Sequence, residues 1–132
     1  MSTWMVLFML TNSLTFESLR VNKGGNICIG VFDEEEEYDA TIDPDYIPEL
    51  VYGECLPATI PSVDLPLEVD KTYAIFAFHD ENENGKLDLN PLKMPKEGFG
   101  FSNNPTLRRR PRWNQISFIH NNVNIVIKMN YL

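Results

Sequence analysis

Hydrophobic residues recur at every second position over much of the chain, which is the period of a β-strand with one buried face. Residues 63–69 alternate most cleanly, with an inward face formed by Val63, Leu65, Leu67 and Val69. Pro66 lacks a backbone N–H and therefore favours an edge or bulged position for this strand. Residues 72–79 are largely apolar on both faces, which predicts a central strand that is covered on two sides.

Two pairs of shorter strands are expected to form hairpins. Residues 14–20 alternate, residues 26–32 are apolar on both faces, and the sequence NKGGN provides the turn between them. Residues 116–120 also alternate, and the Asn-Asn dipeptide at 121–122 provides the turn before the last strand. The predicted inner face of that last strand consists of Val123, Ile125, Ile127 and Met129.

The remaining segments are expected to be loops, and no segment predicts a helix. Residues 33–39 (DEEEEYD) predict a solvated acidic loop, with a second cation site as the alternative. Residues 98–101 (GFGF) predict a structural turn whose two phenylalanine rings pack on the core. About seven short strands predict an all-β fold, an antiparallel Greek-key β-sandwich of the prealbumin- or immunoglobulin-like type.

The first residues are expected to form a separate segment. Residues 4–10 are an apolar run that is short for a secretory signal and follows no Lys or Arg. This run is either the remnant of a signal segment that starts upstream or an apolar first strand or arm. The predicted organisation is an N-terminal arm over residues 1–12 and a single β-sandwich domain over residues 13–132.

Composition narrows the classes of function. The formal net charge of −8 disfavours nucleic acid as a partner, because attraction to phosphates needs a basic face. No apolar run approaches the length that spans a membrane, so the domain is expected not to be membrane-spanning. The acidic balance fits a soluble protein that tolerates divalent cations.

The candidate chemistry lies directly after the predicted central strand. Asp80, Asn82, Asn84, Gly85, Lys86 and Asp88 match the pattern D-x-[DN]-x-[DN]-G-x-x-D, which opens an EF-hand-type calcium loop. Short oxygen-bearing side chains reach a hard cation from a tightly wound loop, the carbonyl of Lys86 adds a ligand, and Gly85 permits the sharp turn. The alternative is a metal-free Asx-rich turn, because Asp and Asn side chains also bond the nearby backbone.

One position departs from the calcium-loop pattern. The last loop position carries a bidentate Glu in EF-hands, and here it is Pro91. Glu97 is the candidate for the missing carboxylate, because the chain can fold back across Met94 and Pro95. The predicted calcium ligands are therefore Asp80, Asn82, Asn84, Lys86, Asp88 and Glu97.

An enzymatic function has little support in the sequence. His79 and His120 are the only histidines, and neither lies in a nucleophile elbow, a zinc-ligand spacing or a triad-like setting. His79 directly precedes the loop and could act as a ligand or a base, or it could be a hydrogen-bonded strand end. The alternative function is an enzyme or a carbohydrate-binding protein that uses the same loop with His79, Tyr73 and Trp113.

Two further features leave alternatives open. Cys28 and Cys55, the latter on a short strand expected to start at Tyr52, could form a disulfide in a secreted protein or remain free thiols. Residues 108–112 (RRRPR) hold four of the eleven cationic residues. This basic run predicts a solvated loop, and the alternatives are an anion site or pairing with residues 33–39 within the molecule or across a dimer.

A long motif runs through the central strand and the loop, YAI-x-x-x-HD-x-N-x-NGKLD-x-N, followed by a Pro, a Glu and GFSNN. It consists here of Tyr73, Ala74, Ile75, His79, Asp80, Asn82, Asn84, Gly85, Lys86, Leu87, Asp88, Asn90, Pro95, Glu97, Gly98, Gly100, Phe101, Ser102, Asn103 and Asn104. This stretch resembles the bacterial domain of unknown function family 2141. The similarity extends more weakly to the Lys-Gly turn at 23–24 and to residues 111–113.

The resemblance implies an exported bacterial β-sandwich, secreted or periplasmic, with no established activity. It also implies that a Glu after the loop, where Glu97 stands, is normal for the family. Together with the loop, it leads to the expected function of a calcium-stabilised module with a structural or binding role in the cell envelope or exterior. The expected partner is an unknown protein or glycan.

Overall fold

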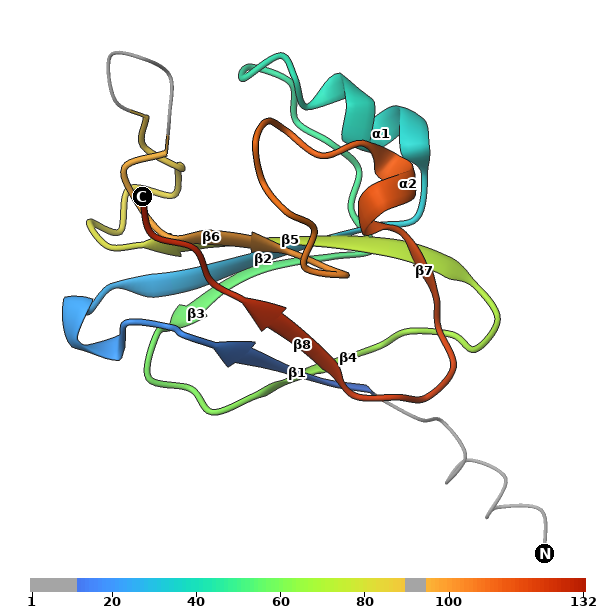
Figure 1. Ribbon diagram of the computed structural model, residues 1–132, viewed down its shortest axis with the longest axis horizontal. Coiled ribbons are helices and arrows are strands. Elements are labelled where there is room, and N and C mark those ends of the chain that lie inside the picture. The colour runs from blue at the N-terminus through green and yellow to red at the C-terminus, as the bar shows by residue number, and fades with distance from the viewer. Residues whose placement is uncertain (1–11, 90–94) are drawn as a thin grey trace, which may run out of the picture.

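Two β-sheets lie face to face in the computed structural model, which describes residues 12–89 and 95–132 (Figure 1). The first sheet has the order β4-β1-β8 and consists of β1 (Asn12–Glu17), β4 (Val63–Leu65) and β8 (Ile125–Lys128). The second sheet has the order β3-β2-β5-β6 and consists of β3 (Tyr52–Pro57), β2 (Asn26–Phe32), β5 (Thr72–Asp80) and β6 (Phe99–Phe101). The short strand β7 (Phe118–Ile119) pairs with the start of β5. This arrangement confirms the predicted all-β sandwich.

The main core fills the space between the two sheets. Alternate residues of β2 and β5 face inward, and both strands contribute side chains with almost no exposed surface, including Ile27, Val31 and Ile75. Leu14 of β1 and Ile127 of β8 close the core from the other sheet and are fully buried. The prediction of β5 as a central strand is confirmed, because it lies between β2 and β6.

Two short helices cover the outer face of the second sheet, where no helix was expected. They are α1 (Glu35–Ala40) and α2 (Trp113–Ile116), which lie side by side above β2 and β5 (Figure 1). The prediction of a solvated acidic loop over residues 33–39 is therefore wrong for most of that run. Three glutamates in the first turn of α1 favour the helix because they lie at the positive end of its dipole. Tyr38 is the buried residue of α1 and anchors it on Phe32, with ring centroids 5.6 Å apart.

Neither predicted hairpin forms. β1 pairs with β4 and with β8, whereas β2 lies in the other sheet, so the turn near Gly24 and Gly25 passes the chain between the sheets. Both glycines have a positive φ, which allows that change of direction at little cost. Likewise, β7 and β8 belong to different sheets. The β1–β8 pair is parallel, so the sandwich is not purely antiparallel, and the described residues form eight strands where about seven were expected. The Greek-key connection stays a prediction.

Some individual positions also differ from the sequence pattern. Val69 and Val123 were expected on inward faces, but 45% and 61% of their surfaces are exposed, because β4 and β8 are shorter than the alternation suggested. The GFGF segment is strand β6 rather than a turn, although both of its phenylalanine rings are buried as expected.

A disulfide joins β2 to β3. Cys28 and Cys55 are directly opposite each other in this antiparallel pair, and their Cα atoms lie 4.0 Å apart. The strand that carries Cys55 starts at Tyr52, as predicted. The question that the sequence left open, disulfide or free thiols, is thus answered by strand register.

Most of the predicted N-terminal arm lies outside the described residues, as do Pro91 and Met94. Within residues 12–89 and 95–132, no helix has the length and apolar character needed to cross a membrane.

Candidate functional site

The predicted calcium loop starts where the central strand β5 ends. Asp80 is the last residue of β5 and only 2% exposed. Its Oδ1 accepts a hydrogen bond from the Asn84 amide at 3.1 Å, and its Oδ2 accepts one from the Gly85 amide at 2.7 Å. Gly85 has a φ of 76°, so the sharp turn predicted at this glycine is present. The carboxylate of Asp80 therefore holds the loop in a tight winding over the end of the sheet.

Asp88 is bound by the two asparagine side chains of the same loop. Asn82 Nδ2 donates to Asp88 Oδ2 at 2.6 Å, and Asn84 Nδ2 donates to Asp88 Oδ1 at 2.8 Å. The hydrogen bonds from Asn84 and then Asn82 lower the pKa of Asp88 below its ordinary value. Because both donors stabilise the charged form, Asp88 stays ionised at neutral pH.

The asparagine carbonyl oxygens accept hydrogen bonds from the loop backbone. Asn82 Oδ1 accepts from the amide of Asn84 at 3.3 Å, and Asn84 Oδ1 accepts from the amide of Lys86 at 3.0 Å. These are the Asx turns that the metal-free interpretation predicts. Both asparagines are exposed, and these hydrogen bonds hold their side chains against the loop backbone.

Glu97 closes the loop from outside it. This side chain is 5% exposed, and its two oxygens accept from the amides of Glu81 at 2.8 Å and Asp88 at 3.0 Å. A backbone hydrogen bond from Lys96 to the carbonyl of Asp88 brings the chain back to this point. The sequence thus located the carboxylate that joins the two ends of the loop, and the structure places it beside Asp88.

The loop offers oxygen atoms only, from three carboxylates and two amides. Oxygen ligands suit a hard cation such as Ca²⁺ and suit zinc or copper poorly. In the described part of the chain, no group of three or more His, Cys, Asp and Glu side chains is gathered closely enough to hold a metal. A bound ion would therefore have to draw Asp88 from its amide partners toward Asp80, while the backbone winding that carries both residues is already present.

The base of the loop is tied to the turn between β1 and β2. His79 is fully buried; its Nε2 donates to the carbonyl of Gly24 at 2.5 Å, and its Nδ1 lies 2.8 Å from the hydroxyl of Tyr131. Arg20 lies over the Tyr131 ring at 4.4 Å from its centroid. Both ring nitrogens of His79 have hydrogen-bond partners. The side chain therefore links the end of β5 to the turn at Gly24 and to the C-terminal segment at Tyr131.

The residues of the alternative, enzymatic site are not brought together. Tyr73 is buried in the core between the sheets, and its hydroxyl accepts a hydrogen bond from the amide of Glu68. Trp113 packs in the second apolar cluster, on the outer face of the sheet under the helices. His79 lies at the far end of β5 from Tyr73, about 20 Å along the strand.

Two polar residues after β6, Ser102 and Asn104, have a structural role that the sequence did not reveal. Ser102 is buried, and its hydroxyl accepts from the amide of Ile75 at 2.9 Å and donates to the carbonyl of Ile116 at 2.5 Å. Asn104 Nδ2 donates to the carbonyl of Val126 at 2.9 Å, and its Oδ1 accepts from the amide of Lys128 at 2.7 Å. Asn104 thus binds the backbone carbonyl and amide at the open edge of β8, as a neighbouring strand would. The signal was a run of polar residues directly after an apolar strand.

The basic run packs beside the acidic helix without carboxylate pairing. The guanidinium of Arg110 lies over the ring of Tyr38 at 4.1 Å and donates to the Tyr38 carbonyl and to the Thr41 hydroxyl, each at 2.6 Å. The hydroxyl of Tyr38 in turn donates to the carbonyl of Pro111 at 2.7 Å. Pairing with the acidic segment, the alternative to a solvated loop, therefore occurs for Arg110 and Pro111 through the Tyr38 ring and hydroxyl, the backbone and the Thr41 hydroxyl, without a carboxylate. Arg108, Arg109 and Arg112 remain exposed, as expected for a solvated loop.

The fold and the loop define a disulfide-linked β-sandwich domain with an Asx-rich loop at the end of its central strand. Residues 15–128 match the model of the family described as "Uncharacterized protein conserved in bacteria (DUF2141)". The chain belongs to this family, which confirms the resemblance seen in the motif. No curated protein and no solved structure shows significant similarity to the chain.

Proposed function

We propose that this domain is a calcium-stabilised module of the bacterial cell envelope or exterior, with a structural or binding role. The observation that carries the proposal is the closed loop at residues 80–88, in which Asp80 winds the backbone and Glu97 joins its two ends. The backbone winding of this loop is already present, so ion binding would require mainly the movement of the Asp88 side chain, and an ion that binds only the folded state stabilises that state.

The proposed ligands are the oxygen atoms of Asp80, Asn82, Asn84, Asp88 and Glu97 together with the Lys86 carbonyl. Calcium takes about six to eight oxygen ligands, so water would complete the shell. Asp80, Asp88 and Glu97 would repel one another if they were drawn together in a chain with net charge −8, and a divalent cation bound between them would offset that repulsion. The proposal assigns Ca²⁺ a structural role, with no chemistry on a substrate.

The disulfide supports the proposed location. Disulfides persist in oxidising compartments such as the periplasm and the exterior and are rare in the bacterial cytosol. Calcium modules of the exterior bind the ion with dissociation constants of about 10⁻⁴ to 10⁻³ M. We expect an affinity in that range, because two of the five side-chain ligands are neutral amides.

The test is thermal unfolding with calcium and with excess chelator. A ligand at about 100 times its dissociation constant stabilises the folded state by roughly 2.7 kcal/mol, which raises the unfolding midpoint by several degrees. In Asp88→Asn this calcium-dependent increment should disappear. Glu83→Gln is the matched control, because it removes the same charge from an exposed position of the same loop that is not among the proposed ligands.

The calcium-dependent increment is the relevant quantity, since Asp80 and Glu97 also bond backbone amides and their loss weakens the fold without any ion. Magnesium at the same concentration serves as the second comparison and should give a smaller increment, because it demands stricter octahedral geometry. The proposal is wrong if chelator-treated and calcium-loaded protein unfold at the same midpoint, or if Asp88→Asn keeps the full increment.

A further inference from the structure

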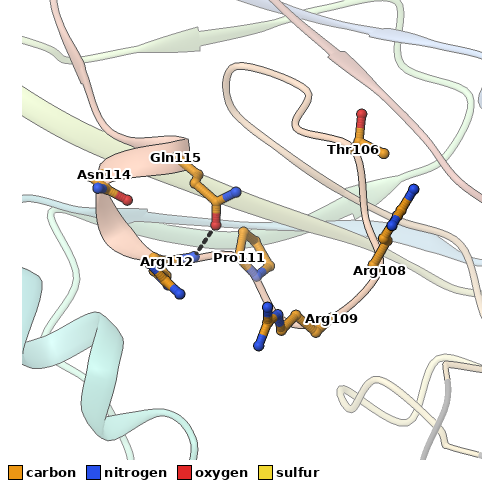
Figure 2. A pocket seen from close by; sticks show the side chains of 7 residues that line it. All are labelled: Thr106, Arg108, Arg109, Pro111, Arg112, Asn114 and Gln115. Atoms are coloured by element: carbon orange, nitrogen blue, oxygen red, sulfur yellow. Dashed lines mark hydrogen bonds between the residues drawn. The ribbon is translucent and has the colours of Figure 1, made fainter.

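A concentration of arginine stands out in this acidic chain. Four of its five arginines lie within residues 108–112, although the net charge is −8. Arg108, Arg109 and Arg112 line an open pocket of about 560 Å³. Figure 2 shows Thr106 and Arg108 on one side of this pocket and Asn114 and Gln115 of α2 on the other, with the rest of the basic loop between them.

Among residues 12–89 and 95–132, no carboxylate lies within ion-pair distance of the arginines that line this pocket. Over the described residues, the ion pairs within 4.0 Å are Lys23–Glu81 and Lys71–Glu68, and neither involves an arginine. The acidic helix α1 lies next to α2, yet the carboxylate of Glu37 is bound by the Tyr46 hydroxyl and the amide of Glu49. Three neighbouring guanidinium groups without a partner repel one another, and an anion would relieve that repulsion.

The backbone that carries these arginines is fixed on both sides. Arg110 and Pro111 are bound to Tyr38 of α1, and Pro111 is buried. Arg112 donates its amide to the Gln115 side chain at 2.8 Å, and Ile116 anchors α2 in the second core cluster. The cationic side chains thus project from an ordered frame, which lowers the entropy cost of binding a ligand among them.

The chemistry of the lining selects a class of ligand. A guanidinium group presents a planar set of N–H donors that matches the oxygens of phosphate and sulfate, whereas lysine acts as a point charge. Thr106, Asn114 and Gln115 add neutral hydrogen-bonding groups around the charges. The pocket is open to solvent and larger than a single inorganic ion, so it can admit a molecule that reaches more than one guanidinium group. We propose that this pocket binds a small phosphate- or sulfate-bearing molecule with two or more negative charges.

The experiment is calorimetric titration of the full chain in calcium-free buffer with pyrophosphate and, separately, with a disulfated disaccharide. We expect saturable one-to-one binding of at least one probe that weakens as salt increases, and no binding of glucose. Pyrophosphate binding would identify phosphate chemistry, and disaccharide binding would identify sulfated glycans. The calcium-free buffer keeps this outcome independent of the proposed calcium loop.

Matched variants distinguish specific binding in this pocket from attraction of anions by the overall charge of the protein. The variant Arg108→Gln/Arg109→Gln/Arg112→Gln should weaken binding at least tenfold. The control Lys23→Gln/Lys71→Gln/Lys128→Gln changes the net charge by the same amount away from the pocket and should leave the affinity within a factor of about two. The double variant Arg108→Gln/Arg109→Gln replaces the triple variant if the latter unfolds.

Three outcomes would overturn the proposal. The first outcome is that neither probe binds and the chain stays monomeric. The second is that the arginine and lysine variants lose affinity equally, which means that net charge alone attracts anions. The third is that neither probe binds and the chain forms a salt-sensitive dimer that Glu35→Gln/Glu36→Gln abolishes. The last result would assign the arginines to pairing with the acidic helix of a second copy.

Discussion

Ser102 illustrates how much a single buried polar group contributes to this fold. Its hydroxyl joins β5 to α2 through Ile75 and Ile116, so one side chain satisfies two backbone groups inside the protein. A buried N–H left without a partner costs about 1–3 kcal/mol. His79 has a similar role at the other end of β5, where it joins Gly24 and Tyr131. Polar residues in apolar surroundings were visible in the sequence, but their partners depend on tertiary contacts that a linear pattern does not contain.

Tyr52 provides a prediction about pH. Burial, followed by the 2.6 Å hydrogen bond to Glu54, raises the pKa of Tyr52 to about 12 from an ordinary value of 10.0. The protonated phenol therefore stabilises the fold below pH 10, and this contribution disappears as the pH rises through about 12. Comparing the tyrosinate absorbance of the wild type with that of Tyr52→Phe should isolate one phenol that titrates near pH 12.

Glu54→Gln is the matched variant for this titration. It removes the charge of the partner and leaves the burial of Tyr52, so the pKa should fall only part of the way to its ordinary value. An unchanged pKa in Glu54→Gln would exclude Glu54 as a cause, and a phenol that titrates at its ordinary value in the wild type would contradict the prediction as a whole.

The edge of β8 shows how one side chain can complete a strand. The peptide groups of Val126 and Lys128 face away from β1 and would be open, but the amide of Asn104 bonds both. An open edge is a place where another chain can pair, so this amide also protects against association. The side chain of Asn104 thus makes the hydrogen bonds that a neighbouring strand would make to β8. The backbone of Asn104 itself lies in a left-handed turn, with a φ of 48°.

Replacing Asn104 by glycine tests this edge closure without backbone strain, because glycine tolerates a positive φ. The amide of Lys128 should exchange with solvent at least tenfold faster, and stability should fall by about 1–2 kcal/mol. Hydrogen exchange measured residue by residue provides the first value and urea unfolding provides the second. The amide of Met129, which donates to Glu17, is an internal reference that should change less.

Asn122→Gly is the control for Asn104→Gly. Asn122 also has a positive φ, 66°, and is exposed, so it reproduces the effect of glycine on the unfolded chain. Equal behaviour of Lys128 in both variants would mean that Asn104 does not close the edge.

Most of the strands could be predicted from the sequence, although β6 was expected to be a turn, whereas the partners of the strands could not be predicted. Alternation specifies which face of a strand is buried, and β4 followed that rule with Val63 and Leu65 buried, but it does not specify the neighbouring strand. Both expected hairpins failed for this reason. Helix α1 has six residues and would not be stable alone. It forms because Tyr38 packs on Phe32 and under Arg110, contacts that the acidic run does not reveal.

The candidate loop was more predictable than the pairing of strands, because its geometry is local. Asp80, Asn84 and Gly85 lie within a few positions of one another, so their spacing alone implies the winding that the structure has. Glu97 is farther along the chain and was identified because the chain could fold back to the loop. The disulfide required the register of β2 against β3, which the sequence does not encode in a readable way.

At the scale of the whole molecule, the disulfide is the single covalent link between the two strands that it joins. Its cysteines are 27 positions apart, and closing a loop of that length restricts the unfolded chain by about 3–4 kcal/mol. The variant Cys28→Ala/Cys55→Ala should therefore lose about that much free energy of unfolding in urea. Wild-type protein with the disulfide reduced is the matched control and should lose a similar amount. A loss below about 1 kcal/mol in both would contradict the prediction.

The parallel pair of β1 and β8 has a consequence for how the chain acquires its shape. Leu14 pairs with Ile125, so almost the whole described chain lies between two residues that meet in one sheet. During synthesis β1 stays incomplete until the final strand is available, and pairings this distant in sequence slow the search for the native topology. A ribosome-bound chain that ends before β8 cannot complete the sandwich, and it exposes strands to which neighbouring chains can add. Folding of this domain is thus expected to be late and concerted, and the period before β8 arrives is when the nascent chain most needs protection from association.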